Sequence, residues 1–233
     1  MCLGCTIPAV ATRFRETCKE ALGELDVTHS PRSLRQKLLP IYKLASEITL
    51  DELGITKPLE TEGNRVSYIP VLEEEEFTIG IFIIPPGGRV PLHNHPDMCV
   101  VSRVLYGEMD MISLDWDSKS FHGAERYFGG NAIVKSNRKL SAQQTQILIP
   151  THKNMHEIRV SPDSQGVALL DILTPNYSEE DDRPCTYFEL STDQGRNNYG
   201  SQNVEMKSAS GVSLFDHYEG DIVTLRAIPE PIY

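Results

Sequence analysis

The chain has 233 residues, 39% of them hydrophobic, and a formal net charge of −11. This length fits one large domain or one domain with an appendage, and the composition allows a buried core. The negative charge argues against a surface that binds nucleic-acid phosphates. No apolar run is long enough to span a bilayer and no secretory signal is visible, so we expect a cytoplasmic or nuclear protein that does not bind membranes. Five irregularly spaced cysteines fit reduced thiols better than a disulfide framework.

The first part of the chain predicts helices. Apolar residues at helical spacing predict one helix over residues 10–22. A second helix is predicted to begin at Ser30, with Pro31 in its first turn, and to break or kink at Pro40. A third, short helix is predicted over residues 49–54, where a Thr and a Glu stand at capping-box spacing before a Gly.

From about residue 65 the chain changes to short β-type runs separated by turn residues. Many short strands at this spacing predict an antiparallel sandwich or barrel, and therefore a mainly β fold. The clearest strands are predicted over residues 77–84, 98–107, 108–116, 145–150, 156–160, 166–173 and 221–228. The polar stretch 191–211 predicts a long loop, either a lid or a plain excursion. We therefore expect a helical extension over residues 1–60, packed on a barrel domain over residues 61–233.

Two histidines stand one residue apart in the stretch PLHNHPDMC. Alternate residues of an extended strand point to the same side, so His93 and His95 could act as two ligands of one metal. The pair is equally compatible with ordinary surface polarity when it is taken alone. The apolar strand and PPGG turn before it favour a metal site, because they would deliver both side chains to the end of a sheet.

The spacing around this pair resembles the first motif of the cupin barrel. Gly87, five further residues, the HNH triplet and later Gly107 stand as they do in that motif. The resemblance implies a cupin-type double-stranded β-helix, or jelly-roll barrel, with N-terminal α-helices. The usual motif carries a glutamate ligand after the second histidine. That place falls on Val100 here, so no carboxylate is available.

A third ligand should come from a later strand. His156 begins a strand whose residues of equal parity are apolar, so it should face inward, where an unpartnered imidazole is costly. His152 lies in a turn, where a solvent-exposed histidine is expected. We therefore predict His93, His95 and His156 as metal ligands. Three neutral histidines leave open coordination positions and suit Fe, Zn, Cu or Ni, so the ligands alone do not choose the metal.

A carboxylate is predicted on the inward face of the strand GVALLDIL. Asp171 shares the parity of the apolar residues around it, and a buried carboxylate needs a partner. It lies either near the metal site or in a structural role, bonded to backbone amides. The segment TPNYSEEDDRPCTYFE follows directly and is expected to fold over the mouth of the barrel. That segment contains four candidate pocket residues, which are Tyr177, Arg183, Cys185 and Tyr187.

Taken together, several segments resemble one family of enzymes. HNHP, GEMDMISLDW, the triplet Asn154–His156 and LLDILTPNYSEEDDRPCTYF stand in the order and spacing of the thiol dioxygenases of the cysteamine dioxygenase and plant cysteine oxidase family. The resemblance covers residues 80–190. It implies one Fe(II) per chain, held by the three histidines. It also implies that Asp171 and Tyr177 line the pocket near the substrate, and it matches Cys185 and Tyr187 to positions of a possible cysteine–tyrosine crosslink.

Two residues depart from the pattern of this family. Asp97 stands where glycine usually follows HNHP, and it puts a negative charge near the predicted mouth, where it could influence substrate preference. Cys99 stands where threonine is common, and it should face away from its neighbours Met98 and Val100 and serve packing. The turn THKNMH also lacks the family's paired glycines.

The resemblance implies the reaction and its partners. O2 is added to the sulfur of an aminothiol, either cysteamine or the N-terminal cysteine of a peptide or protein, to give a sulfinic acid. A monomer is expected, and the family also admits a role as an oxygen sensor in an N-degron pathway. Free cysteine is the nearest competing substrate, and its carboxylate would need a cation such as Arg89, Arg103 or Arg183. Cupin barrels also serve as metal-dependent isomerases and as non-catalytic binding modules.

The chain begins Met1-Cys2, and removal of Met1 would expose a cysteine of the type that this family oxidises. Self-oxidation is one interpretation. The other is that Cys2 and Cys5 are incidental, a lipidation site or a weak metal site.

Overall fold

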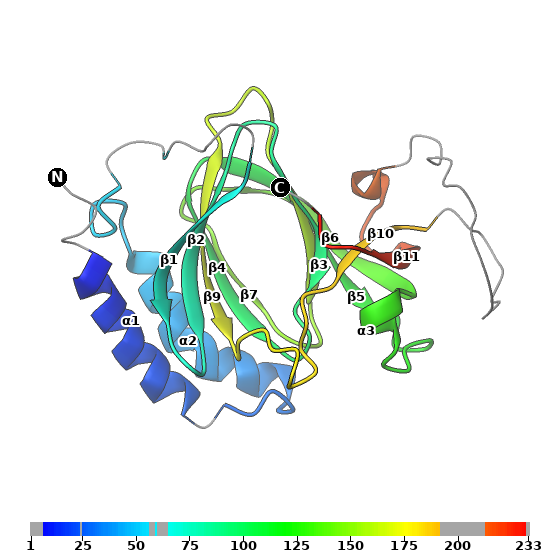
Figure 1. Ribbon diagram of the computed structural model, residues 1–233, viewed down its shortest axis with the longest axis horizontal. Helices are drawn as coiled ribbons and strands as arrows, with labels where there is room; N and C mark the ends of the chain where they lie inside the picture. Colours follow the sequence, from blue (N-terminus) through cyan, green and yellow to red (C-terminus); the bar gives the residue numbers. More distant parts are fainter. Residues whose placement is uncertain (1–6, 24, 56–58, 60–64, 192–212, 232–233) are drawn as a thin grey trace.

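The computed structural model describes residues 7–23, 25–55, 59, 65–191 and 213–231. Two helices cover one face of a β-structure that is built from two sheets (Figure 1). The Met1-Cys2 start and, apart from its first residue, the predicted loop 191–211 lie outside the described residues.

The two long helices form where the apolar spacing predicts them. Helix α1 spans Ile7–Leu22 and α2 spans Pro31–Glu47, and the Ser30 hydroxyl caps α2 by accepting from a backbone N–H. Of the two predicted alternatives at Pro40, the break is wrong, because α2 continues through this residue, and the kink stays a prediction. Packing explains the continuation, since one face of α2 stays buried on both sides of the proline, at Leu34, Leu38, Ile41, Leu44 and Ala45. Among the described residues, no helix is long and apolar enough to cross a bilayer.

The predicted third helix is also wrong. Residues 50–54 form consecutive turns instead. The capping-box hydrogen bonds are nevertheless present, because the Glu52 carboxylate accepts from the Thr49 backbone N–H at 2.9 Å and the Thr49 hydroxyl accepts from the Glu52 N–H at 3.3 Å. Gly54 follows with a positive φ of 70°, which ends the segment before a helix can extend.

The strands pair into two antiparallel sheets. The first has the order β1-β2-β9-β4-β7, with the bounds β1 Ser67–Glu73, β2 Thr78–Ile84, β9 Val167–Thr174, β4 Cys99–Tyr106 and β7 Thr145–Leu148. The second closes on itself in the order β10-β11-β6-β5-β8-β3, with the bounds β10 Tyr187–Leu190, β11 Ile222–Ile228, β6 Asn131–Ser141, β5 Glu108–Trp116, β8 Met155–Arg159 and β3 Arg89–Asn94. This arrangement confirms the predicted cupin-type double-stranded β-helix.

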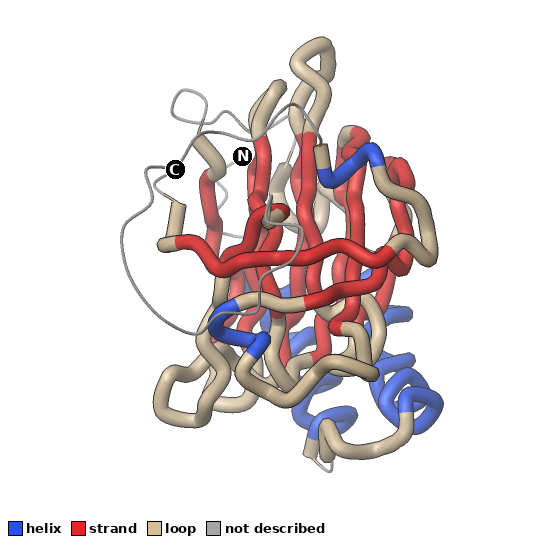
Figure 2. Tube along the Cα trace, turned by 90° about the vertical axis from the view of Figure 1, so that its right-hand side faces the viewer, coloured by secondary structure: helices blue, strands red, loops and turns tan. Residues whose placement is uncertain are grey.

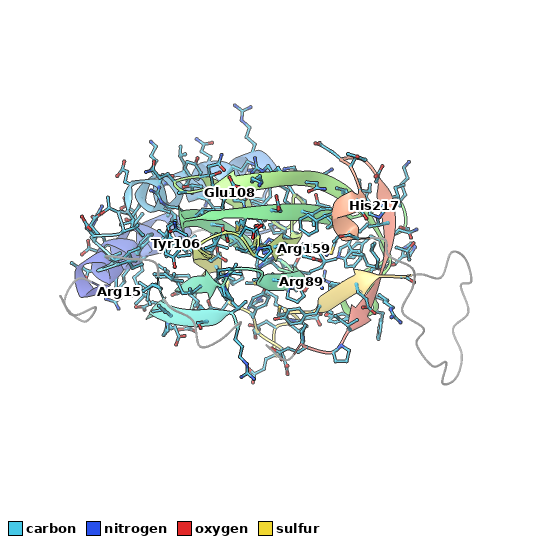
Figure 3. All side chains as sticks on the ribbon, turned by 90° about the horizontal axis from the view of Figure 1, so that it is seen from above. Arg15, Arg89, Tyr106, Glu108, Arg159 and His217 are labelled. Carbon is cyan, nitrogen blue, oxygen red and sulfur yellow. The ribbon has the colours of Figure 1, made fainter. Side chains whose placement is uncertain are left out.

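Two short helical segments lie next to the last strands of the second sheet. Helix α3 spans Glu125–Phe128, and a 3₁₀ turn spans Leu214–Asp216. In Figure 2 the side of the molecule on which β10, β11 and α3 lie in Figure 1 faces the viewer. On its outside, Arg89 and Arg159 lie on neighbouring strands (Figure 3), and both bind the buried carboxylate of Glu157, at 2.9 and 2.8 Å.

Buried apolar side chains gather in three clusters. The first lies between the helices and the outer face of the first sheet. The second, here called the inter-sheet core, lies between the two sheets and includes Val100 and Leu169 from the first and Met111 and Ile158 from the second. The third fills the closed second sheet. Strand β4 is therefore buried on both faces, and Cys99 packs towards the helices as expected, while burial raises the pKa of its thiol to about 12.

The helix layer should contribute strongly to stability. Phe14 of α1 is fully buried against the first sheet, whereas Phe128 of α3 is 75% exposed. We expect Phe14→Ala to lower the free energy of unfolding by about 3–5 kcal/mol, because it leaves a cavity in the core. The matched change Phe128→Ala should cost less than about 0.5 kcal/mol. Urea denaturation of both variants measures the difference, and equal losses would contradict the packing described.

Candidate active site

Three histidines meet on the inter-sheet side of the second sheet. His93 lies on β3 directly opposite His156 on β8, and His95 follows the end of β3. One ligand atom from each ring lies within 4.8 Å of the others, and the ring centroids are 4.6 to 4.8 Å apart. The structure thus brings together the three predicted ligands, in a group that could bind a metal ion.

Hydrogen bonds orient two of these rings. The carbonyl oxygen of Pro91 accepts from His93 Nδ1 at 2.8 Å, and that of Asn154 accepts from His95 Nδ1 at 2.9 Å. A proton on each Nδ1 leaves each Nε2 with a free lone pair for a metal. His156 Nδ1 is buried and has no hydrogen-bond partner among the described residues.

Burial keeps all three imidazoles neutral. It lowers the pKa of His93, lowers that of His95 to about 3 and lowers that of His156 well below its ordinary value. Since a metal ligand must be unprotonated, and since an unpartnered buried nitrogen is costly, this donor set fits a divalent ion of the kind that imidazole prefers.

Asn154 holds the turn that carries His95. Its side-chain amide donates to the carbonyl of His95 at 2.6 Å, and its side-chain oxygen accepts from the His95 backbone N–H at 3.3 Å. The backbone N–H of Asn154 in turn donates to Asp115 Oδ1 on β5 at 3.0 Å, next to Lys153 with its positive φ of 63°. Asparagine next to a ligand strand carries no obvious signal, so sequence reasoning missed this positioning role of Asn154 and Asp115.

Two tyrosines and a cysteine border the histidines. The Tyr177 ring stacks on His95 with centroids 5.7 Å apart, and its hydroxyl donates to the Asn94 carbonyl at 2.9 Å. Tyr187 begins β10 opposite His93, with ring centroids 5.9 Å apart. The Cys185 thiol lies within hydrogen-bond reach of both tyrosine hydroxyls, and burial raises its pKa and that of Tyr177. The segment after β9 therefore reaches the histidine cluster.

Asp171 faces the inter-sheet core from the first sheet. It stands on β9 between Gly80 of β2 and Ser102 of β4, and it is only 5% exposed. Burial raises the pKa of its carboxyl to about 7, against a hydrogen bond from Ser102 that lowers it. Its Oδ1 is buried and has no hydrogen-bond partner among the described residues. The carboxyl thus offers an unused acceptor on the sheet that faces the metal-ligand strands.

Two predicted pocket residues, Asp97 and Arg183, make their side-chain contacts away from the three histidines. Asp97 has a positive φ of 52°, which explains why a glycine suits this position, and its carboxylate pairs with Arg126 Nη1 at 3.0 Å. Arg183 donates to Asp181 at 2.9 Å and to the Asn176 carbonyl at 3.2 Å, so both of these hydrogen bonds stay within its own segment.

The two remaining sequence questions concern His152 and the missing carboxylate. His152 lies outside the cluster, with its side chain 38% exposed and its Nδ1 4.0 Å from Asp115. Val100, at the place of the usual cupin glutamate, is buried in the inter-sheet core. Fold and site together define a cupin-type barrel with a group of three histidines that could bind a metal ion and that includes no carboxylate.

Comparison with known proteins agrees. The model of the PCO_ADO family matches residues 29–231, so this chain belongs to that family. A probable 2-aminoethanethiol dioxygenase of Dictyostelium discoideum is 34% identical over 68% of this chain and 72% of its own length. Plant cysteine oxidase 2 of Arabidopsis thaliana is 38% identical over 78% of this chain and 67% of its own length. The 2-aminoethanethiol dioxygenase of Mus musculus is 26% identical over 76% of this chain and 77% of its own length. A solved cupin superfamily protein of Desulfitobacterium hafniense shares 16% identity over 55% of this chain and 90% of its own, with a TM-score of 0.37.

The Asn154 side chain should matter for metal affinity. Asn154→Ala removes the hydrogen bonds that hold the His95 turn, so we expect the affinity for a divalent metal to fall about 10- to 100-fold. His152→Ala, two residues earlier and outside the cluster, is the matched control and should bind metal normally. Competition between each variant and a chelator for Co(II) provides the measurement, and equal affinities of all three proteins would refute the positioning role.

The raised pKa of Asp171 predicts a pH-dependent stability. Between the ordinary carboxyl pKa of 3.8 and about 7, the folded metal-free protein holds a proton that the unfolded chain has lost, so stability falls as the pH rises. Asp171→Asn lacks this loss, and its stability relative to the original protein should rise by up to about 4 kcal/mol from about pH 4 to about pH 8. Urea denaturation of both metal-free proteins across this range would show it, and parallel pH profiles would contradict it.

Proposed function

We propose that this protein is a thiol dioxygenase that binds one Fe(II) per chain and adds both atoms of O2 to the sulfur of an aminothiol. The substrate is cysteamine or the N-terminal cysteine of a peptide or protein. The observation that carries this proposal is the cluster of His93, His95 and His156, which are neutral and have no carboxylate beside them in the ligand group. Membership of the PCO_ADO family and the names of the relatives support it.

The reaction balances without a further reductant. The thiol sulfur loses four electrons and O2 gains them, so that a thiol and O2 give a sulfinic acid. Fe(II), when bound, supplies the centre at which a thiolate sulfur and O2 react. Because His93, His95 and His156 are neutral, they leave the two positive charges of such an ion uncompensated, and this favours binding of the substrate as a thiolate.

Asp171 is suited to orient the other end of the substrate. It projects from the first sheet into the space that the histidines border from the second, and its free Oδ1 can accept a hydrogen bond from the substrate amine. Tyr177 acts differently, because its hydroxyl already donates to the carbonyl of Asn94, the residue between His93 and His95. We assign Tyr177 to positioning His95 and to bordering the pocket.

Cys185 places a buried thiol beside two tyrosines. Its thiol lies between the hydroxyls of Tyr177 and Tyr187, so a crosslink to Tyr187, as the family resemblance suggests, stays a proposal for this chain. Asp97 is paired with Arg126, which offsets its charge at the rim and weakens its expected influence on substrate choice.

Free cysteine is the less favoured substrate. Its carboxylate needs a cation in the pocket, and the three candidate arginines are engaged elsewhere. Arg89 binds Glu157 on the outside of the second sheet, Arg103 donates to the Ser46 carbonyl on the helix side, and Arg183 binds Asp181. None of these contacts directs a guanidinium towards the histidine cluster.

The proposal predicts oxygen uptake with specific products. Protein reconstituted anaerobically with Fe(II) should consume one O2 per thiol when mixed with cysteamine or a Cys-initiated peptide, and the product mass should rise by two oxygen atoms. Free cysteine should compete poorly with the peptide. His156→Ala should abolish uptake, whereas the exposed His152→Ala should retain it. Failure of the reconstituted protein to oxidise both cysteamine and the peptide would refute the proposed function.

A further inference from the structure

Tyr68 enters the inter-sheet space through a gap that Gly80 leaves. Tyr68 stands on β1 opposite Phe82 of β2, and the two rings pack with centroids 5.0 Å apart. The far end of the Tyr68 ring, including its hydroxyl, lies over Gly80, where a Cβ would overlap it. Gly80 does not have a positive φ, so its backbone conformation does not require glycine. The close approach of the ring accounts for it instead.

This gap places the Tyr68 hydroxyl next to the strand of Asp171. Gly80 is directly opposite Asp171 in the pairing of β2 with β9. Phe82, which packs on Tyr68, also packs against the inter-sheet core, so the ring lies on the inner face of the first sheet. The Tyr68 side chain therefore reaches from the edge strand β1 across β2 towards the carboxyl that faces the histidines.

The exposed fractions of the side chains show that Tyr68 lies nearer the surface than Asp171 and the three histidines. The three histidines and Asp171 are at most 9% exposed, whereas Tyr68 is 42% exposed. A substrate with its sulfur at the histidines and its amine at Asp171 would extend outward past Tyr68. The Tyr68 hydroxyl has no hydrogen-bond partner among the described residues, and a phenol can donate to a peptide carbonyl.

We propose that Tyr68 is a specificity-determining residue, whose hydroxyl donates to the carbonyl of an N-terminal cysteine and whose ring forms the outer wall of the substrate channel. Cysteamine ends at the amine and has no carbonyl, so it cannot make this contact. Tyr68 therefore favours Cys-initiated peptides over cysteamine. The inference rests on the proposed function, since it needs the thiol to bind at the three histidines.

Tyr68→Phe tests the hydroxyl without removing the ring. Three substrates separate its effects: cysteamine, then cysteinamide, which adds one carboxamide with its carbonyl on the carbon that bears the amine, and a Cys-Gly-initiated peptide. We expect KM to rise about three- to tenfold for cysteinamide and the peptide, the range of one lost hydrogen bond, with kcat and the KM for cysteamine unchanged. The Kd of the peptide, measured anaerobically by calorimetry on the metal-loaded protein, should rise by the same factor.

Two further variants distinguish loss of this one contact from a general loss of structure. Gly80→Ala should displace the ring and weaken peptide binding, and the double variant with Tyr68→Phe should bind no more weakly than Gly80→Ala alone, because both act on one contact. Tyr106→Phe is the matched control, since this tyrosine (labelled in Figure 3) packs on the helix side of the first sheet and accepts from the Leu59 N–H at 2.9 Å. It should lower stability and leave every KM unchanged.

The outcomes distinguish the two proposals. If Tyr68→Phe raises KM and Kd equally for cysteamine and the peptide, or for neither, the assignment of Tyr68 is overturned while the dioxygenase proposal stands. If the unaltered protein oxidises neither substrate, the proposed function fails. Calorimetry then still tests Tyr68, because an unaltered protein that does not bind the peptide, or binds it as tightly as Tyr68→Phe does, overturns the inference.

Discussion

The site depends on two backbone carbonyls that accept hydrogen bonds from buried imidazoles. The oxygens of Pro91 and Asn154 bind Nδ1 of His93 and His95, which selects the tautomer with a free Nε2. Neither carbonyl is positioned by chance. The first precedes its histidine within β3, and the second lies in the turn before β8 that Asp115 holds through a backbone N–H. The exclusion of water lowers the pKa of both rings and keeps these hydrogen bonds from being exchanged for solvent.

The two facing sheets supply different groups to the pocket. The second sheet and the segment leading into it supply the three clustered histidines and the two tyrosines beside them. The first sheet supplies an acceptor at Asp171 and an edge residue at Tyr68, so groups on it can vary without disturbing the ligands. The helices cover the outer face of this first sheet, and its apolar side chains there pack with those of the helices in one cluster.

Much of this arrangement could be predicted from residue patterns. Parity along a strand suffices to place Cys99 on the face opposite to Met98 and Val100, and Asp171 and His156 towards the inside, since a strand has only two faces. His152 is placed outside for another reason, its position in a turn. Spacing alone fails for the segment 49–54, where the capping residues bond as predicted but Gly54 ends the segment at once. It also fails at Pro40, where tertiary packing of α2 outweighs the missing hydrogen bond.

Contacts between distant segments could not be predicted in this way. The sequence around Tyr68 and around Gly80 does not show that the Tyr68 ring lies over Gly80. The pairing of β1 with β2 creates that contact. The role of Asn154 arises from its position across from His95, some sixty residues earlier in the chain. The strand β6 is polar along much of its length, and its role in the second sheet follows only from its partners β5 and β11.

The closure of the second sheet has a consequence for its mechanical properties. Between β5 and β6 the ladder is long, but β10 meets β3 through a single residue pair, Tyr187 with His93, helped by two hydrogen bonds between Asn94 and Thr186. A barrel opens most readily where the fewest pairings must break. The seam of this barrel therefore runs beside His93, one of the three clustered histidines, so local opening of the sheet should begin next to the candidate metal site.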